Sequence, residues 1–152
     1  MLDIPGFVQL LCEKLPSNVE PSVVKRIFEL LVNVSAEESA CGKLLRMKEC
    51  DKIVVKVSHV VADPQSEFAD LAVSFLVNAS RREDTCQGLI AVMGDVVTLT
   101  QLIEVFAQPN FNKKGQTLDM LAHVFGNITQ VKDVRRYLIS FLNFNHERTP
   151  GH

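Results

Sequence analysis

Apolar and polar residues follow one another along the chain with the 3.6-residue period of amphipathic helices, and this pattern repeats. Three of the helical segments carry an asparagine near their end, with apolar residues six, three and two positions before it. Those positions share one helical face, which a folded helix buries. The asparagines are Asn33, Asn78 and Asn127, so they lie 45 and 49 residues apart. Self-similarity at this spacing predicts a repeat protein.

Further helical patterns stand on both sides of each asparagine-bearing segment. The preceding pattern runs up to a proline, whose fixed φ and missing N–H close one helix or open the next. The preceding patterns are residues 7–15, 53–61 and 96–106, and the prolines are Pro16, Pro64 and Pro109. Each unit is therefore predicted as a helix, a proline turn, a longer helix, a tight turn and a shorter helix. Residues 53–57 alone resemble a strand, and their place in the repeat overrides their β-propensity.

Units of two or three helices at this spacing are typical of armadillo and HEAT repeats. Such a unit cannot bury its apolar face alone, so neighbouring units stack. We therefore predict an all-α fold, a right-handed superhelical solenoid of about three three-helix repeats in a single domain. The predicted repeats are residues 3–50, 51–94 and 95–145, followed by a tail at 146–152.

The turn after each asparagine predicts how the next helix begins. Ser35 with Glu38, and Ser80 with Glu83, match the S-x-x-E capping box, in which the serine caps the following helix. The third unit has a lysine where the glutamate would stand. Asp133 is the expected replacement cap there.

Composition and charge narrow the class of protein. Apolar residues make up 47% and charged residues 22% of the chain, and the formal net charge is −2. A near-neutral chain has no overall field for nucleic acid or an anionic membrane, so neither is an expected partner. The short arginine and lysine pairs are expected to be solvated helix ends. The N-terminus has no signal-peptide pattern and no apolar run reaches the length of a membrane span, which favours a cytoplasmic or nuclear protein.

Candidate catalytic groups are few. The four cysteines form no CxxC pair, and no two histidines have metal-ligand spacing. Cys41 and Cys86 occupy equivalent repeat positions, which indicates packing in a reducing compartment rather than a disulfide framework. No Gly-rich phosphate loop is present. The sequence therefore predicts a non-enzyme, with no catalytic, cofactor or metal site.

The asparagines are the candidate binding residues. Stacked units would place Asn33, Asn78 and Asn127 in a row along one groove, where amide groups can bond the backbone of a partner. The residues one helical turn earlier would flank the same groove, and they are Glu29, Ser74 and His123. Alternatively, each asparagine holds one unit against the next. The same asparagines fall in N-x-S/T glycosylation patterns, which we interpret as a consequence of the repeat.

An apolar helix that ends in Asn-x-Ser resembles the third helix of an armadillo repeat. In peptide-binding armadillo proteins, such as importin-alpha and beta-catenin, that asparagine lines the concave groove. Importin-alpha also carries a tryptophan four residues before it. This chain has no tryptophan, which disfavours recognition of a basic nuclear-localisation peptide.

Residues 67–139 resemble more specifically the eukaryotic armadillo-type family of elongation factor 2 chaperones. The matching features are Leu-Val-Asn-Ala-Ser-Arg at 76–81, Pro-Asn-Phe-Asn at 109–112, Gly-Asn-Ile-Thr-Gln at 126–130 and Val-Arg-Arg-Tyr-Leu at 134–138. The resemblance implies an adaptor that helps elongation factor 2 to fold with the cytosolic chaperonin. An alternative is an armadillo-type adaptor for a linear peptide in transport or signalling. Family members are longer, which implies further repeats beyond residue 152 and exposed apolar surface near Leu138, Phe141 and Leu142.

Overall fold

The structure is a computed structural model, which describes residues 6, 9–10, 20–63, 65–94, 96–108 and 116–147. Eight α-helices are defined within these residues, and no strand occurs among them. The helices are α2 (Pro21–Ala36), α3 (Glu38–Leu45), α4 (Cys50–Ala62), α5 (Ala69–Ser80), α6 (Glu83–Val92), α7 (Val96–Ala107), α8 (Thr117–Ile128) and α9 (Lys132–Glu147). The all-α prediction is confirmed, including the helical state of residues 53–57.

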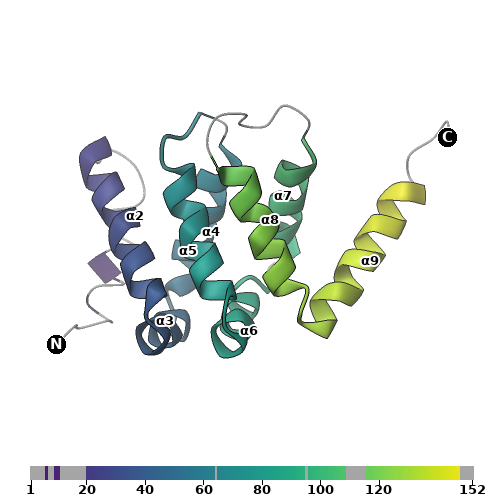
Figure 1. Ribbon diagram of the computed structural model, residues 1–152, viewed down its shortest axis with the longest axis horizontal. Coiled ribbons are helices and arrows are strands. Elements are labelled where there is room, and N and C mark those ends of the chain that lie inside the picture. Colours follow the sequence, from purple (N-terminus) through teal and green to yellow (C-terminus); the bar gives the residue numbers. More distant parts are fainter. Residues whose placement is uncertain are drawn as a thin grey trace.

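The helices pack in a pattern that returns every third element. α5 lies against α2 on one side and α8 on the other, α6 lies against α3, and α7 lies against α4. Figure 1 shows α2, α5 and α8 as successive members of one row, with α4 and α7 behind them. We call α2, α5 and α8 the asparagine row, because each carries one of the three repeat asparagines. α4 and α7 match the predicted first helices of the second and third units. Of the predicted helix at residues 7–15 only residues 9 and 10 are described, and both are helical, whereas the three prolines lie outside the described residues.

The helical period of the apolar residues explains which side chains form the core. The row contributes large side chains without solvent exposure, among them Phe28, Leu31, Phe75 and Leu121. α2 and α8 each bury one stripe and leave exposed residues on the other side. In α5 every residue except Asp70 is buried or half-buried, because α5 lies between α2 and α8. Leu30 is an exception, since it aligns with the buried Phe75 and Val124 but remains 46% exposed at the end of the row.

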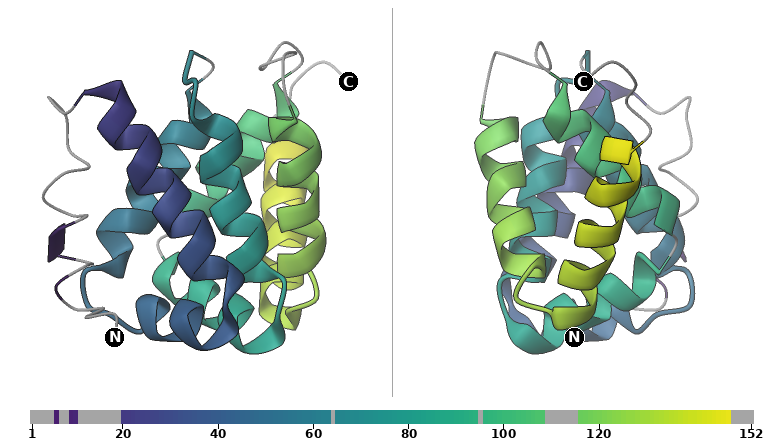
Figure 2. Two further views of the ribbon diagram at one scale, coloured as in Figure 1. Left: turned by 60° about the vertical axis from the view of Figure 1, so that its left-hand side comes forward. Right: turned by 90° about the vertical axis from the view of Figure 1, so that its right-hand side faces the viewer.

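The predicted helix lengths were only partly right. α2 is longer than α3, but α4 has 13 residues against 12 in α5, and α7 and α8 have 12 each. α9 has 16 residues, so the third unit does not end in a shorter helix, and it reaches two residues into the predicted tail. In Figure 1 α9 leans away from α8 toward its C-terminal end, and both views of Figure 2 place it at the α8 end of the molecule.

The expectation of exposed apolar surface on α9 was partly wrong. Leu138 is half-buried and packs against the core. Phe141 and Leu142 lie in the helix, but their side chains fall outside the described set. Exposed apolar surface does occur nearby, because Ile139 is 59% exposed.

The predicted capping boxes were wrong. Ser35 lies in the last turn of α2 and its hydroxyl donates to the Val32 carbonyl oxygen at 2.8 Å. Ser80 is the last residue of α5 and donates to the Val77 carbonyl oxygen at 3.2 Å. A serine can bond a carbonyl of the preceding helical turn, and this keeps both residues within the helix that they were expected to leave.

The helices that follow have other residues as their N-caps. Glu37 is the N-cap of α3, and its carboxylate accepts hydrogen bonds from the backbone N–H groups of Ala40 and Ser39. Arg82 is the N-cap of α6 and makes no side-chain cap bond. Asp133 lies within the first turn of α9 rather than before it. A carboxylate in the first turn still stabilises the helix through its dipole.

Candidate functional site

The repeat asparagines tie one helix of the row to the next. The Asn78 side-chain amide nitrogen donates to the Val32 carbonyl oxygen and to the Ser35 hydroxyl, both at 3.2 Å. The Asn127 amide nitrogen donates to the Ser80 hydroxyl at 3.1 Å. The same hydroxyls donate to carbonyls of their own helices, so each serine accepts from the following asparagine while it donates backward. We call each of these contacts an Asn–Ser tie.

The ties decide part of the question that the sequence left open. An amide nitrogen carries two hydrogens, and both of those on Asn78 have an acceptor in α2. Ser35 and Ser80 are buried, which is the environment of a structural contact. Asn78 and Asn127 therefore hold one helix against the preceding one, which is the structural role that the sequence left as an alternative to partner binding. Their side-chain oxygens remain as acceptors for another group.

The two ends of the row differ from its interior. Asn33 is exposed on α2, and its amide makes no hydrogen bond within the described part of the chain. Thr129 follows α8 at the position that Ser35 and Ser80 hold in their units. Its hydroxyl donates to the carbonyl oxygens of Phe125 at 2.7 Å and Gly126 at 3.1 Å.

The three flanking residues lie one turn before the asparagines, on the same row. Glu29 pairs with Arg26 on α2, with 3.0 Å between the carboxylate oxygen and the guanidinium nitrogen. Ser74 is half-buried and donates to the Asp70 carbonyl oxygen at 2.7 Å. His123 is exposed and lines an open hollow on α8 together with Asp119 and Asn127. Of the six predicted residues, Asn33 and His123 are thus the most available to a partner.

Two arginines missed by the sequence interpretation also hold helix ends. The Arg82 guanidinium donates to the Ala36 carbonyl oxygen at 2.9 Å, and Arg135 donates to the carbonyl oxygens of Thr129 and Gln130 at 2.8 and 3.0 Å. A cation at the C-terminal end of a helix meets unpaired carbonyls and the negative end of its dipole. The expectation of solvated arginine pairs was correct for Arg81, Arg135 and Arg136, which are exposed, whereas Arg82 is half-buried.

Comparison with known proteins identifies the family. Residues 60–149, more than half of the chain, match the domain described as "Domain of unknown function (DUF383)". The chain belongs to the DUF383 family. The matched part begins in the last turns of α4 and continues to the end of α9.

Curated relatives of this DUF383 chain carry one shared name. It is 32% identical over 136 residues to "Protein HGH1 homolog" of Danio rerio, an alignment that covers 89% of the chain and 35% of the relative. The HGH1 homolog of Xenopus tropicalis is 28% identical over 133 residues, which cover 86% of the chain and 36% of the relative. The HGH1 homolog of Drosophila melanogaster is 32% identical over 115 residues, which cover 72% of the chain and 31% of the relative. The chain thus spans about a third of the length of these relatives. No solved structure was found to match it.

The cysteines of the DUF383 chain pack as predicted where the structure describes them. Cys41, Cys50 and Cys86 are buried and form no disulfide with any described residue, and Cys12 lies outside the described residues. Burial raises the pKa of the Cys41 thiol to about 11 and also raises the pKa of Cys86. Both side chains are therefore neutral thiols at physiological pH, whereas a nucleophilic cysteine needs thiolate character.

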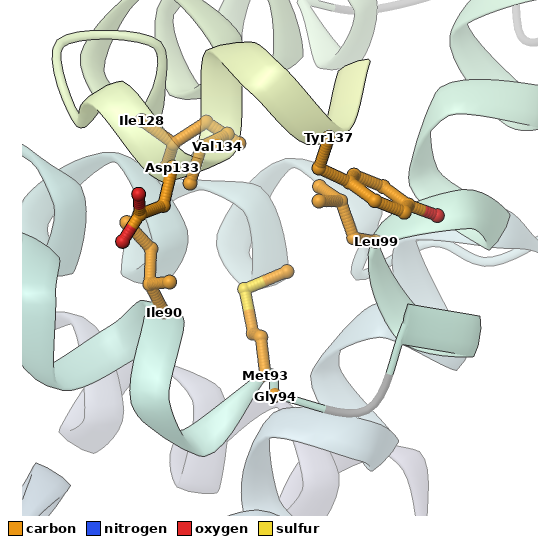
Figure 3. Close-up of a pocket in the computed structure, with 8 residues that line it drawn as sticks. All are labelled: Ile90, Met93, Gly94, Leu99, Ile128, Asp133, Val134 and Tyr137. Atoms are coloured by element: carbon orange, nitrogen blue, oxygen red, sulfur yellow. The ribbon is translucent and has the colours of Figure 1, made fainter. Parts of the chain in front are cut away.

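An apolar cavity of about 230 Å³ separates α9 from α6 and α7. Figure 3 shows Ile90 of α6 and Met93 just after that helix on one side, Leu99 of α7, and Val134 and Tyr137 of α9 above them. The Tyr137 hydroxyl lies 2.6 Å from the Thr100 hydroxyl, which holds α9 to α7. Asp133 is the single charged residue of the lining, so the cavity is mainly a gap in apolar packing.

In the described part of the chain, no group of three or more His, Cys, Asp or Glu residues is arranged to hold a metal ion. No helix among the described residues has the length and apolar character that crossing a membrane requires.

Proposed function

We propose that the chain is part of a non-catalytic, armadillo-type scaffold that binds a protein client. The observation that carries this proposal is the asparagine row, in which α2, α5 and α8 stack in one register through the Asn–Ser ties. Repeats stacked in this way form a solenoid, and solenoids bind their partners along an extended surface. The right-handed superhelical arrangement expected from the sequence is part of the same proposal.

The surface proposed for the client is the exposed side of the asparagine row. Equivalent positions on successive helices form parallel lines of side chains, and one such line contains Glu29, Ser74 and His123. Asn33 and His123 are exposed, whereas Asn78 has both amide hydrogens engaged within the fold. The exposed pair is therefore assigned the larger share of client contact, and Asn78 a share through its side-chain oxygen alone.

The proposed client is translation elongation factor 2, folded in the cytoplasm with the cytosolic chaperonin. Support comes from the resemblance of residues 67–139 to the armadillo-type elongation factor 2 chaperones, together with the relation of the chain to HGH1 homologs. A folding adaptor contacts a domain over a broad surface, which a row of three helices provides.

Direct binding of the chain to purified elongation factor 2 tests the proposal. The wild-type chain should bind, and the double variant Asn33→Ala with His123→Ala should bind at least about fivefold more weakly, because each lost contact costs about 0.5–1.5 kcal/mol. Lys52→Ala on α4 is the matched control, since it removes an exposed side chain from a different face. Absence of binding by the wild-type chain would reject this client.

A second measurement separates the proposed client mode from peptide recognition. Short extended peptides cut from elongation factor 2 should compete poorly with its intact domains. If one such peptide binds as tightly as the intact protein, the chain is instead a groove reader for linear segments. If the double variant binds normally, the client surface lies outside the asparagine row.

A further inference from the structure

The same helix-to-helix interface occurs twice inside the asparagine row, once between α2 and α5 and once between α5 and α8. On the earlier helix of each pair, the tied serine lies in a stripe with the residues four and seven positions before it, since these share a helix face. The stripe contains Phe28, Leu31 and Ser35 on α2, and Val73, Leu76 and Ser80 on α5. All six are at most 3% exposed. We call this stripe the serine face.

The later helix of each pair presents a matching stripe, which we call the asparagine face. It contains the tying asparagine and the apolar residue three positions before it. These residues are Phe75 and Asn78 on α5, and Val124 and Asn127 on α8. Phe75 and Val124 have no exposed surface. Each internal interface therefore joins one serine face to one asparagine face, with a hydrogen bond from asparagine to serine.

At the two ends of the row, one half of this interface is left uncovered. α2 presents an asparagine face with Asn33 exposed, Leu30 46% exposed and Val23 41% exposed. α8 leads into the remaining serine face, where Ala122 is exposed and Phe125 and Thr129 are half-buried. The contrast with the fully buried Phe28, Leu31 and Ser35 shows how much of the α8 surface lacks cover.

Aromatic side chains enlarge the uncovered face at the α8 end. Phe106 of α7 is 45% exposed and meets Phe125 edge-to-face, with the ring centroids 5.4 Å apart. Exposed charges are complementary as well, because Lys25 of α2 and Asp119 of α8 stand at equivalent positions, eight residues before their asparagines. The α2 end and the α8 end thus fit each other in apolar contact, hydrogen bonding and charge.

We propose that a second copy of this chain docks its α2 against α8 of the first, which repeats the internal interface between molecules. Asn33 of one copy donates to the Thr129 hydroxyl of the next. The Thr129 hydrogen is already given to backbone carbonyls, and its oxygen lone pairs can accept. The contact is heterologous, so a dimer retains one free end of each kind and further copies add.

Sedimentation velocity on the chain over a wide concentration range tests this assembly. The average mass of the wild type should rise steadily with concentration and should not stop at that of a dimer. Leu30→Glu places a carboxylate in the proposed contact surface at the α2 end, and Ala122→Glu does the same at the α8 end. Each should weaken association at least about tenfold. Both residues are exposed, so the helical circular dichroism spectrum should be retained, and Val55→Glu on α4 is a matched exposed control that should associate normally.

Mixing the two variants gives the decisive observation. The intact α8 end of the Leu30→Glu chain should bind the intact α2 end of the Ala122→Glu chain, producing a one-to-one pair that grows no further. The reverse pairing would set two glutamates against each other and should not form. A wild type that stays monomeric overturns the proposal. So does a Leu30→Glu chain that still dimerises alone, because the contact would then join two identical ends.

Discussion

The asparagine row and the row formed by α3, α6 and α9 differ in how regularly they stack. In the asparagine row, both junctions have an Asn–Ser tie and buried apolar side chains. In the other row, α3 and α6 pack closely. A Cβ atom added at Gly88 of α6 would lie only 3.5 Å from the Leu45 side chain of α3. α9 then diverges from α6 and leaves the apolar cavity between them.

This difference shows what a polar contact adds to apolar patterning. Two apolar stripes can pack against each other in many registers and at many angles. A hydrogen bond between buried groups on two helices forms in only one of these arrangements. The asparagine row has that constraint at each junction. α9 is held instead by its first turns and by the bond between Tyr137 and Thr100.

The largest expected effect compares a core leucine from each region. Leu76→Ala in α5 should lower the free energy of unfolding by about 2–5 kcal/mol, because Leu76 has no exposed surface and its removal leaves a cavity. Leu138→Ala in α9 should cost less than about 2 kcal/mol, because Leu138 is only half-buried. Urea denaturation measures both. Equal losses would show that α9 is packed as firmly as the asparagine row.

The asparagines should rank by the number of bonds that each makes. Asn78→Ala removes two hydrogen bonds between α5 and α2, so it should cost about 1–3 kcal/mol. Asn127→Ala removes one and should cost about 0.5–1.5 kcal/mol. Asn33→Ala should leave stability nearly unchanged in dilute protein, where no second copy is bound. Thermal denaturation of the three variants checks this order, and a costly Asn33→Ala would contradict it.

Whether a feature of the fold could be predicted from the sequence depends on the kind of contact that produces it. The apolar stripes before the asparagines predicted the helices and the pairing of equivalent units, because helical period is a property of each segment. The capping boxes failed because Ser35-x-x-Glu38 satisfies the motif, yet the helix continues through Ser35 and Glu37 caps instead. A local motif cannot show that a serine is needed by an asparagine 43 residues later, as Ser35 is by Asn78.

The divergence of α9 could not be predicted for a related reason. Its sequence carries apolar residues at the repeat positions, including Val134 and Leu138, and both do pack inward. The angle at which a helix leaves its neighbour depends on how the facing surfaces fit, and that is a property of the pair. Of the candidate site, the sequence named the asparagines and two alternative roles for them, and the bonds of Asn78 and Asn127 were needed to identify the structural role of these two.

The hydroxyl pair that anchors α9 should have a moderate effect. Tyr137→Phe and Thr100→Val each remove the hydrogen bond between α9 and α7, so each should cost about 0.5–1.5 kcal/mol. The double variant should cost little more than either single one, because both remove the same bond. A double-mutant cycle by denaturant unfolding measures the coupling. Fully additive losses would mean that the bond contributes nothing to holding α9.

The smallest expected effect is the pH dependence of stability that comes from the Glu37 cap of α3. The backbone N–H groups of Ala40 and Ser39 bond the Glu37 carboxylate and lower its pKa from the usual 4.5. A carboxyl with a lowered folded pKa stabilises the protein above its unfolded pKa, and this contribution is lost as the pH falls through the folded value. The stability advantage of the wild type over Glu37→Gln should therefore shrink as the pH falls below about 4.5. Parallel pH curves for the two proteins would rule out this cap.

The central position of α5 has a consequence for the order in which the molecule opens. α5 lies against α2, α4, α6 and α8 at once, so its backbone amides exchange with solvent only when much of the fold has separated. In the described part of α9 the packing against other helices is sparser than that of α5, so α9 can detach while the other helices stay together. Local opening therefore begins at α9 and exposes Met93, Leu99 and Ile128 to solvent before any Asn–Ser tie is broken.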